Sequence, residues 1–100
     1  MYEIIYMRAD YEPWWQFDGW EEEIVERWSF AEAHQAIEKL EDVLCGMRGE
    51  HANEAERDGR FWAFWSKKEV CFCEHCDEDL QLYHGVITMK DGEPSPFSRK

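Results

Sequence analysis

Apolar residues alternate or cluster in four short stretches that predict β-strands. Tyr2 to Ala9 carries Ile and Tyr on both faces, which is typical of a strand inside a sheet. Glu21 to Trp28 keeps most of its apolar residues on one face. Val70 to Cys73 and Tyr83 to Met89 also alternate, and we expect these two strands to pair with each other as a hairpin.

The segment from Ser29 to about Met47 has the periodicity of an amphipathic helix. Apolar residues recur there at steps of three and four, at Phe30, Ala33, Ile37, Leu40, Leu44 and Met47. Ser29 and Glu32 have the spacing of a capping box, which predicts that the helix begins at Ser29. Leu40 lies in the middle of the apolar stripe, so we expect it in the core.

Four rings follow within five residues: Phe61, Trp62, Phe64 and Trp65. Helical spacing puts three of them on one face, which predicts a short second helix. The order β-β-α-β-β does not alternate strictly. It therefore predicts an α+β fold, a small antiparallel sheet with the long amphipathic helix and the short second helix on one face. We expect residues 1–92 to form a single domain and residues 93–100, with two Pro and two Ser, a mobile C-terminal tail.

Acidic residues outnumber basic ones by 23 to 11, which gives a net charge of −12. The basic residues are scattered, so we expect no nucleic-acid-binding face, and the charge disfavours an anionic membrane. It favours a basic protein partner, although net charge also serves solubility. No signal peptide or bilayer-spanning run is visible, and we expect a cytoplasmic protein with reduced thiols. The sequence does not define an oligomeric state.

The second cluster of rings, Trp14, Trp15 and Trp20, lies beside Pro13 and the Asp18-Gly19 turn signal. Tryptophan is enriched at binding hot spots, so one interpretation is a partner-binding surface at these three residues. The other is that the rings cover one end of a small core. We expect part of this segment to be exposed.

The stretch from Cys71 to His84 concentrates cysteine and histidine. Cys73 and Cys76 have the Cys-x-x-Cys spacing that presents two thiolates to one zinc ion. His84 would supply a third ligand from the returning strand. The fourth would be Cys71, on the same face as Cys73, or a carboxylate of Asp77 or Asp79. The sequence thus offers zinc as a cofactor, although a strong zinc signature has two such pairs and this chain has one.

Two other interpretations of the cysteines stay open. In Cys73-Glu74-His75-Cys76, a protonated His75 would stabilise a thiolate, as in a redox dithiol. Alternatively, the cysteines are small buried residues with no chemistry of their own. No catalytic constellation emerges, so an enzyme is the less favoured class.

Several motifs together resemble a family of short uncharacterised proteins from low-GC Gram-positive bacteria, filed as a domain of unknown function. The matching stretches are Glu12-Pro13-Trp14-Trp15, Gly19-Trp20-Glu21-Glu22-Glu23-Ile24, Phe64-Trp65 and the run from Cys73 to His84. The last motif in the family reads Cys-Glu-Glu-Cys-Asp-Glu-Asp-Leu-Gln-x-Tyr-His, so His75 replaces a Glu and Cys71 lies outside the pattern. The resemblance covers the chain to about residue 90. It implies a small cytoplasmic bacterial protein without an assigned activity.

These observations predict a protein-binding module with an acidic, Trp-rich surface. The alternative is a metal-binding or thiol-redox protein centred on Cys73 and Cys76.

Overall fold

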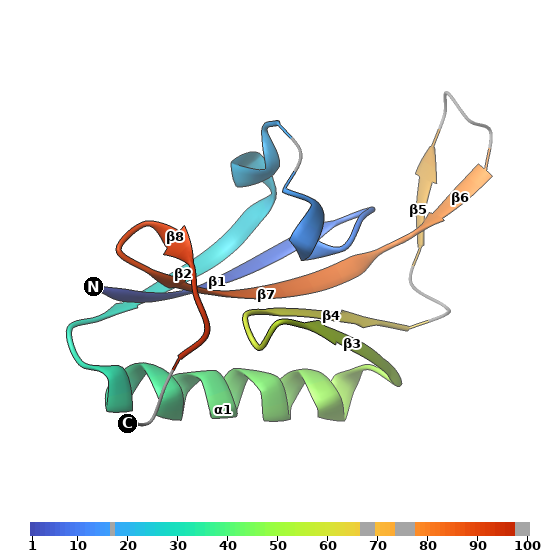
Figure 1. Ribbon diagram of the computed structural model, residues 1–100. Coiled ribbons are helices and arrows are strands. Elements are labelled where there is room, and N and C mark those ends of the chain that lie inside the picture. The colour runs from blue at the N-terminus through green and yellow to red at the C-terminus, as the bar shows by residue number, and fades with distance from the viewer. Residues whose placement is uncertain (17, 67–69, 74–77, 98–100) are drawn as a thin grey trace.

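The computed structural model describes residues 1–16, 18–66, 70–73 and 78–97, with only the backbone of residues 70–73 and 78–80. Within these ranges, six strands form one antiparallel sheet and two more form a separate hairpin (Figure 1). The elements are β1 (Tyr2–Ala9), η1 (Pro13–Trp15), η2 (Trp20–Glu23), β2 (Ile24–Phe30), α1 (Ala33–Glu50), β3 (Asn53–Arg57), β4 (Phe61–Trp65), β5 (Val70–Cys73), β6 (Glu78–Gln81), β7 (Tyr83–Lys90) and β8 (Glu93–Pro94).

The main sheet has the order β2-β1-β7-β4-β3, and β8 turns back onto β7. Helix α1 lies along one face, while the 3-10 segments η1 and η2 lie on the other (Figure 1). The α+β class and the antiparallel sheet are therefore confirmed. The predicted strand order and the second helix are wrong, because residues 53–65 form two strands instead.

The four rings at 61–65 belong to β4, which lies between β7 and β3. Trp62 and Phe64 face the helix, whereas Phe61 faces the opposite side. A strand buried on both faces has a continuous apolar run, which periodicity alone cannot distinguish from a helix. The turn before it contains Asp58 and Gly59, both with positive φ, and this Asp-Gly pair is the signal that the sequence interpretation missed.

The helix α1 begins later than predicted. Ser29 is paired with Glu3 in the β1–β2 ladder, and Glu32 occupies the N-cap position without a side-chain cap. A capping box contributes only about 1 kcal/mol, less than a strand that extends its ladder and packs Phe30 on the core. The prediction for Leu40 is confirmed, since this side chain is only 9% exposed.

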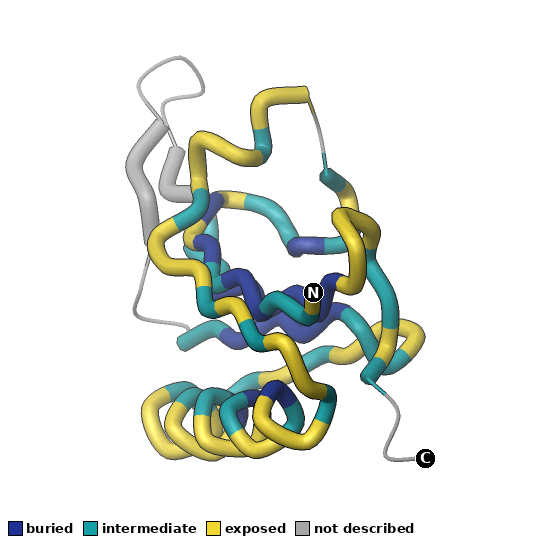
Figure 2. Tube along the Cα trace, turned by 90° about the vertical axis from the view of Figure 1, so that its left-hand side faces the viewer, coloured by how far each residue is buried: buried dark blue, intermediate teal, exposed yellow. Residues whose placement is uncertain are grey.

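The sheet separates two apolar clusters. Figure 2 shows the buried positions gathered in the middle of the molecule, between exposed outer segments. The helix-side cluster contains Ile4, Leu40, Leu44, Trp62, Phe64 and Val86. The opposite cluster contains Ile5, Met7, Ala9, Phe61, Ile87 and Met89, and Tyr11, Trp14, Trp20 and Ile24 pack against it. Because both faces are covered, β1 and β7 carry apolar residues at consecutive positions rather than at alternate ones.

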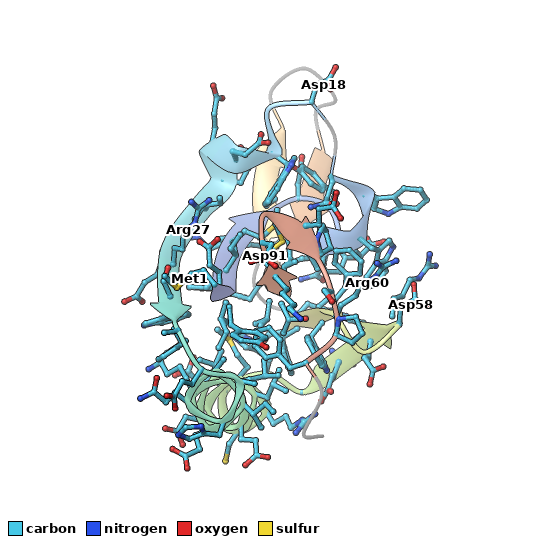
Figure 3. All side chains as sticks on the ribbon, turned by 60° about the vertical axis from the view of Figure 1, so that its left-hand side comes forward. Met1, Asp18, Arg27, Asp58, Arg60 and Asp91 are labelled. Atoms are coloured by element: carbon cyan, nitrogen blue, oxygen red, sulfur yellow. The ribbon has the colours of Figure 1, made fainter. Side chains whose placement is uncertain are left out.

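The chain after β7 also packs on the sheet. Asp91 and Gly92 form a two-residue turn with positive φ at both positions, and β8 follows. The buried Thr88 hydroxyl donates to the Ser95 carbonyl oxygen at 2.6 Å. Phe97 packs against the helix-side cluster. At the same end of the sheet, the Met1 ammonium contacts an Asp91 carboxylate oxygen at 2.8 Å. Both residues are labelled in Figure 3.

Gly85 in β7 allows Pro13 to pack directly on the strand. A β-carbon at this position would lie 2.8 Å from Pro13 Cβ and 2.9 Å from Met7 Cγ. Both distances are too short for carbon atoms. We expect Gly85→Ala to lower the free energy of unfolding by about 1–3 kcal/mol, because Pro13 or β7 must move. Chemical denaturation measures this change.

Gly46 provides the matched control. It lies within α1 and is exposed, and no other part of the described chain comes within 4 Å of the place that an alanine β-carbon would occupy. Gly46→Ala should therefore raise stability by about 0.5–1 kcal/mol, through helix propensity. Equal effects of the two substitutions would contradict the close packing of Pro13.

Candidate functional site

The structure separates the predicted zinc ligands into two elements. Cys71 and Cys73 lie in β5, which pairs with β6 so that Cys73 is opposite Glu78. The predicted pairing of Val70–Cys73 with Tyr83–Met89 is wrong, because β7 already has β1 on one edge and β4 on the other. His84 therefore belongs to the main sheet and not to the cysteine hairpin. Cys76 and Asp77, and the side chains of Cys71, Cys73 and Asp79, lie outside the described residues.

His84 lies in a buried polar cluster on the helix side of the sheet. Its Nδ1 atom is 2.6 Å from the Tyr6 hydroxyl, and its ring stacks on His51 with centroids 4.3 Å apart. The Nδ1 atom of His51 is 3.0 Å from the Ser66 hydroxyl. Among the described residues, the buried His51 Nε2 atom has no hydrogen-bond partner, and a carboxylate oxygen of Glu50 lies 3.9 Å away.

Sequence reasoning did not find His51, because nothing in its neighbourhood sets it apart from other histidines at helix ends. Only the folding of the end of α1 onto the sheet brings the two imidazoles together. Within the part of the chain that the structure describes, no three His, Cys, Asp or Glu side chains form a group that could hold a metal ion. Zinc binding by Cys71, Cys73, Cys76 and His84 therefore stays a prediction.

Elemental analysis of protein purified without a metal-affinity tag tests this prediction. We expect about one zinc per chain, lost on Cys73→Ser and Cys76→Ser and reduced by His84→Ala. A chelator should lower the melting temperature, since metal binding is coupled to folding. His34→Ala is the control, because His34 is exposed near the start of α1. Zinc-free wild-type protein with an unchanged melting temperature in chelator would end the zinc interpretation.

The three predicted partner-binding tryptophans differ in exposure. Trp14 and Trp20 are half-buried and pack against the cluster opposite the helix. Trp15 is 52% exposed, and its indole N–H donates to a Glu12 carboxylate oxygen at 3.0 Å. Two of the three rings, Trp14 and Trp20, therefore cover the core, and the third, Trp15, faces solvent.

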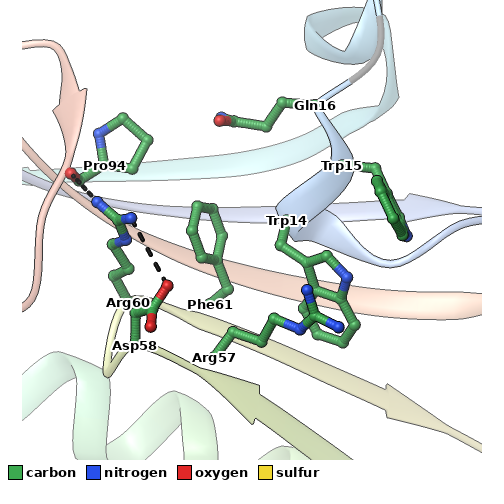
Figure 4. Close-up of a pocket in the computed structure, with 8 residues that line it drawn as sticks. All are labelled: Trp14, Trp15, Gln16, Arg57, Asp58, Arg60, Phe61 and Pro94. Atoms are coloured by element: carbon green, nitrogen blue, oxygen red, sulfur yellow. Dashed lines mark hydrogen bonds and ion pairs between the residues drawn. The ribbon is translucent and has the colours of Figure 1, made fainter.

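Trp14 and Trp15 form one side of a depression of about 370 Å³, which we name the arginine groove (Figure 4). Its other lining residues are Gln16, Arg57, Asp58, Arg60, Phe61 and Pro94. The Arg57 guanidinium lies over the Trp14 ring, 4.6 Å from its centroid. Segments η1, β8 and the β3–β4 hairpin build this groove together. Arg57 lies beside Trp14, and Arg60 lies at the other end of the groove beside Pro94 (Figure 4).

A second depression, of about 490 Å³, lies where β1 and β2 separate. We name it the acidic groove. Its lining residues are Arg8, Ala9, Asp10, Glu22, Glu23, Ile24, Val25 and Leu82. The β1–β2 ladder ends at Met7 and Ile24, whereas the ladder between β1 and β7 continues to Ala9. The groove is the space between β1 and β2 beyond the point where their pairing ends.

Burial and the negative charge near the acidic groove both affect the pKa of the neighbouring Tyr11. Burial raises the pKa of this phenol above its ordinary value, and nearby negative charges raise the pKa further. Three acidic residues of this region, Glu23, Asp10 and Glu21, thus act on the same phenol.

In the part of the chain that the structure describes, the fold is that of a small α+β protein. Helix α1 covers one face of an antiparallel sheet, and the grooves lie at the edges of that sheet. The chain belongs to a family described as a protein of unknown function, DUF1033, whose model matches residues 1–100. The predicted membership of an uncharacterised family is thereby confirmed. A search of curated proteins and a search of solved structures each gave no match. Among the described residues, no helix is both long and apolar enough to cross a membrane.

Proposed function

We propose that this protein is a binding module whose acidic groove receives a basic segment of a partner protein. The observation that carries the proposal is the concentration of Asp10, Glu22 and Glu23 around an apolar floor, with Arg8 as the one cation among the described lining residues. Opposite charges across an interface direct association and select partners. The net charge of −12 extends this attraction beyond the groove itself.

The apolar floor suits the side chains of a basic segment. Val25 is 54% exposed, and Ala9, Ile24 and Leu82 line the same groove. Lys and Arg have long apolar stems, which cover such a surface while their charged ends reach the carboxylates. Trp20 begins η2, the element that carries Glu22 and Glu23, and its ring anchors this element on the core.

The backbone at the groove also supports an extended ligand. Arg8 and Ala9 keep their partners in β7, but the ladder between β1 and β2 has ended before it reaches them. An extended segment that lies beside them would add main-chain hydrogen bonds to the charge contacts, as in β-strand addition. We therefore propose an extended rather than a helical basic segment.

A second candidate function is zinc binding or thiol-redox chemistry at Cys73-Glu74-His75-Cys76, in the cytoplasm where thiols stay reduced. One described contact favours it. The Tyr6 hydroxyl holds Nδ1 of His84 at 2.6 Å, and a hydrogen bond at one ring nitrogen is how ligating histidines are commonly oriented.

A fluorescein-labelled peptide of alternating Lys and Val tests the principal proposal by fluorescence anisotropy. Glu22→Lys with Glu23→Lys should weaken binding at least about tenfold, because two attractive contacts become repulsive. Both residues are exposed, so the fold should persist. Binding should also weaken as salt screens the charges.

Glu38→Lys with Asp42→Lys is the matched control, since both residues are exposed on α1 and the change in net charge is the same. This variant should bind the peptide almost as well as the wild type. Equal loss in both variants would mean that only the overall charge attracts the peptide, and the groove would have no role.

A further inference from the structure

We propose that the arginine groove binds a small aromatic oxyanion, a ligand that joins one carboxylate or phosphate group to a planar ring. This site is separate from the acidic groove and has the opposite charge preference. Arg57 and Arg60 line it, and Asp58 is the one acid among its described lining residues. In a chain with 23 acidic and 11 basic residues, such a local excess of positive charge stands out.

Arg57 is held ready for an anion. Its guanidinium carbon lies 4.6 Å from the centroid of the Trp14 ring, within the range of a cation–π interaction. A cation–π contact does not use up the N–H donors of the guanidinium, and their planar fork matches a planar or tetrahedral oxyanion. In the described part of the chain, Arg48 and Arg60 each lie within ion-pair distance of a carboxylate, whereas Arg57 does not.

The second cation of the groove, Arg60, is only partly satisfied. One terminal nitrogen donates to the Pro94 carbonyl oxygen at 3.3 Å, and the other lies 3.6 Å from an Asp58 oxygen (Figure 4). Its Nε atom is buried without a partner among the described residues, and so is Nε1 of Trp14. Buried donors without acceptors are uncommon and costly. An oxyanion in the groove would accept from the terminal nitrogens of Arg57 and Arg60, which carry the positive charge of this surface.

The rings of the groove define the rest of the ligand. Trp15 is 52% exposed, and its hydrogen bond to Glu12 fixes the indole. The exposed part of this indole is apolar surface at the rim of the groove, which a planar ring of a ligand would contact. The volume of about 370 Å³ is near the lower end for small-molecule sites, so it suits one ring system and one anionic group. The net charge of −12 disfavours a longer polyanion.

Two probes distinguish the anionic groups: adenosine 5′-monophosphate for phosphate and indole-3-acetate for carboxylate. Adenosine and inorganic phosphate separate the contributions of ring and anion. In nuclear magnetic resonance titrations of the wild-type protein, one of the two probes should shift the indole N–H signals of Trp14 and Trp15. Adenosine alone and phosphate alone should bind at least about tenfold more weakly than the joined probe.

Arg57→Gln should lower the affinity for the probe that binds by a factor of at least about ten. Arg57→Lys, which keeps the charge but loses the planar fork, should give an intermediate affinity. Arg27→Gln is the control, because it changes the net charge equally. Figure 3 shows Arg27 on the opposite side of the view from Asp58 and Arg60, which line the groove. Glu22→Lys with Glu23→Lys should leave probe binding intact, which separates this site from the acidic groove.

Two results would overturn the proposal. The first is the absence of signal shifts at Trp14 and Trp15 with both probes at about 1 mM. The second is an affinity that Arg57→Gln and Arg27→Gln reduce equally, since the probe would then respond to net charge alone. Both measurements use the intact, folded chain, and a spectrum of Arg57→Gln without probe verifies that its fold is unchanged.

Discussion

The position of β7 is the constraint on which the rest of the structure depends. This strand has β1 on one edge and β4 on the other, and apolar clusters cover both of its faces. Strand β4 pairs with β7 along residues 84–87, and β8 pairs with its last two residues. Buried backbone groups must be paired, so the first half of β7 has no edge left for the strand that carries Cys71 and Cys73. The cysteine hairpin consequently forms its own two-stranded sheet. Helix α1 covers one apolar face of the sheet, and the 3-10 segments cover the other.

The sequence predicts the elements whose burial follows a simple period. The strand at 2–9 and the core position of Leu40 are read correctly, because their patterns depend on local spacing. Phe61 and its neighbours are misread, since a strand buried on both faces carries no period at all. Ser29 is misread for a different reason. Its local capping signal competes with pairing to Glu3, which is distant in the sequence.

The candidate sites were less accessible to sequence reasoning. The exposure of Trp15 agrees with the expectation for its segment, but nothing near Arg57 indicates that it lies over Trp14. Each groove is assembled from segments that are far apart along the chain, so their composition appears only once the sheet is formed. The same holds for the stacking of His51 on His84. Residue spacing along the chain predicts ligands that lie on one turn. It does not predict a surface to which several distant elements contribute.

The close approach of Pro13 to Gly85 has a consequence for how these surfaces could diverge among related chains. Pro13 opens η1, the element that carries Trp14 and Trp15. A larger residue at position 85 would have to displace Pro13, and the two indoles would move with it. Ligand preference at the surface is thus tied to a residue that contacts no ligand. A substitution in the middle of the sheet would thus change the shape of the arginine groove without replacing any residue that lines it.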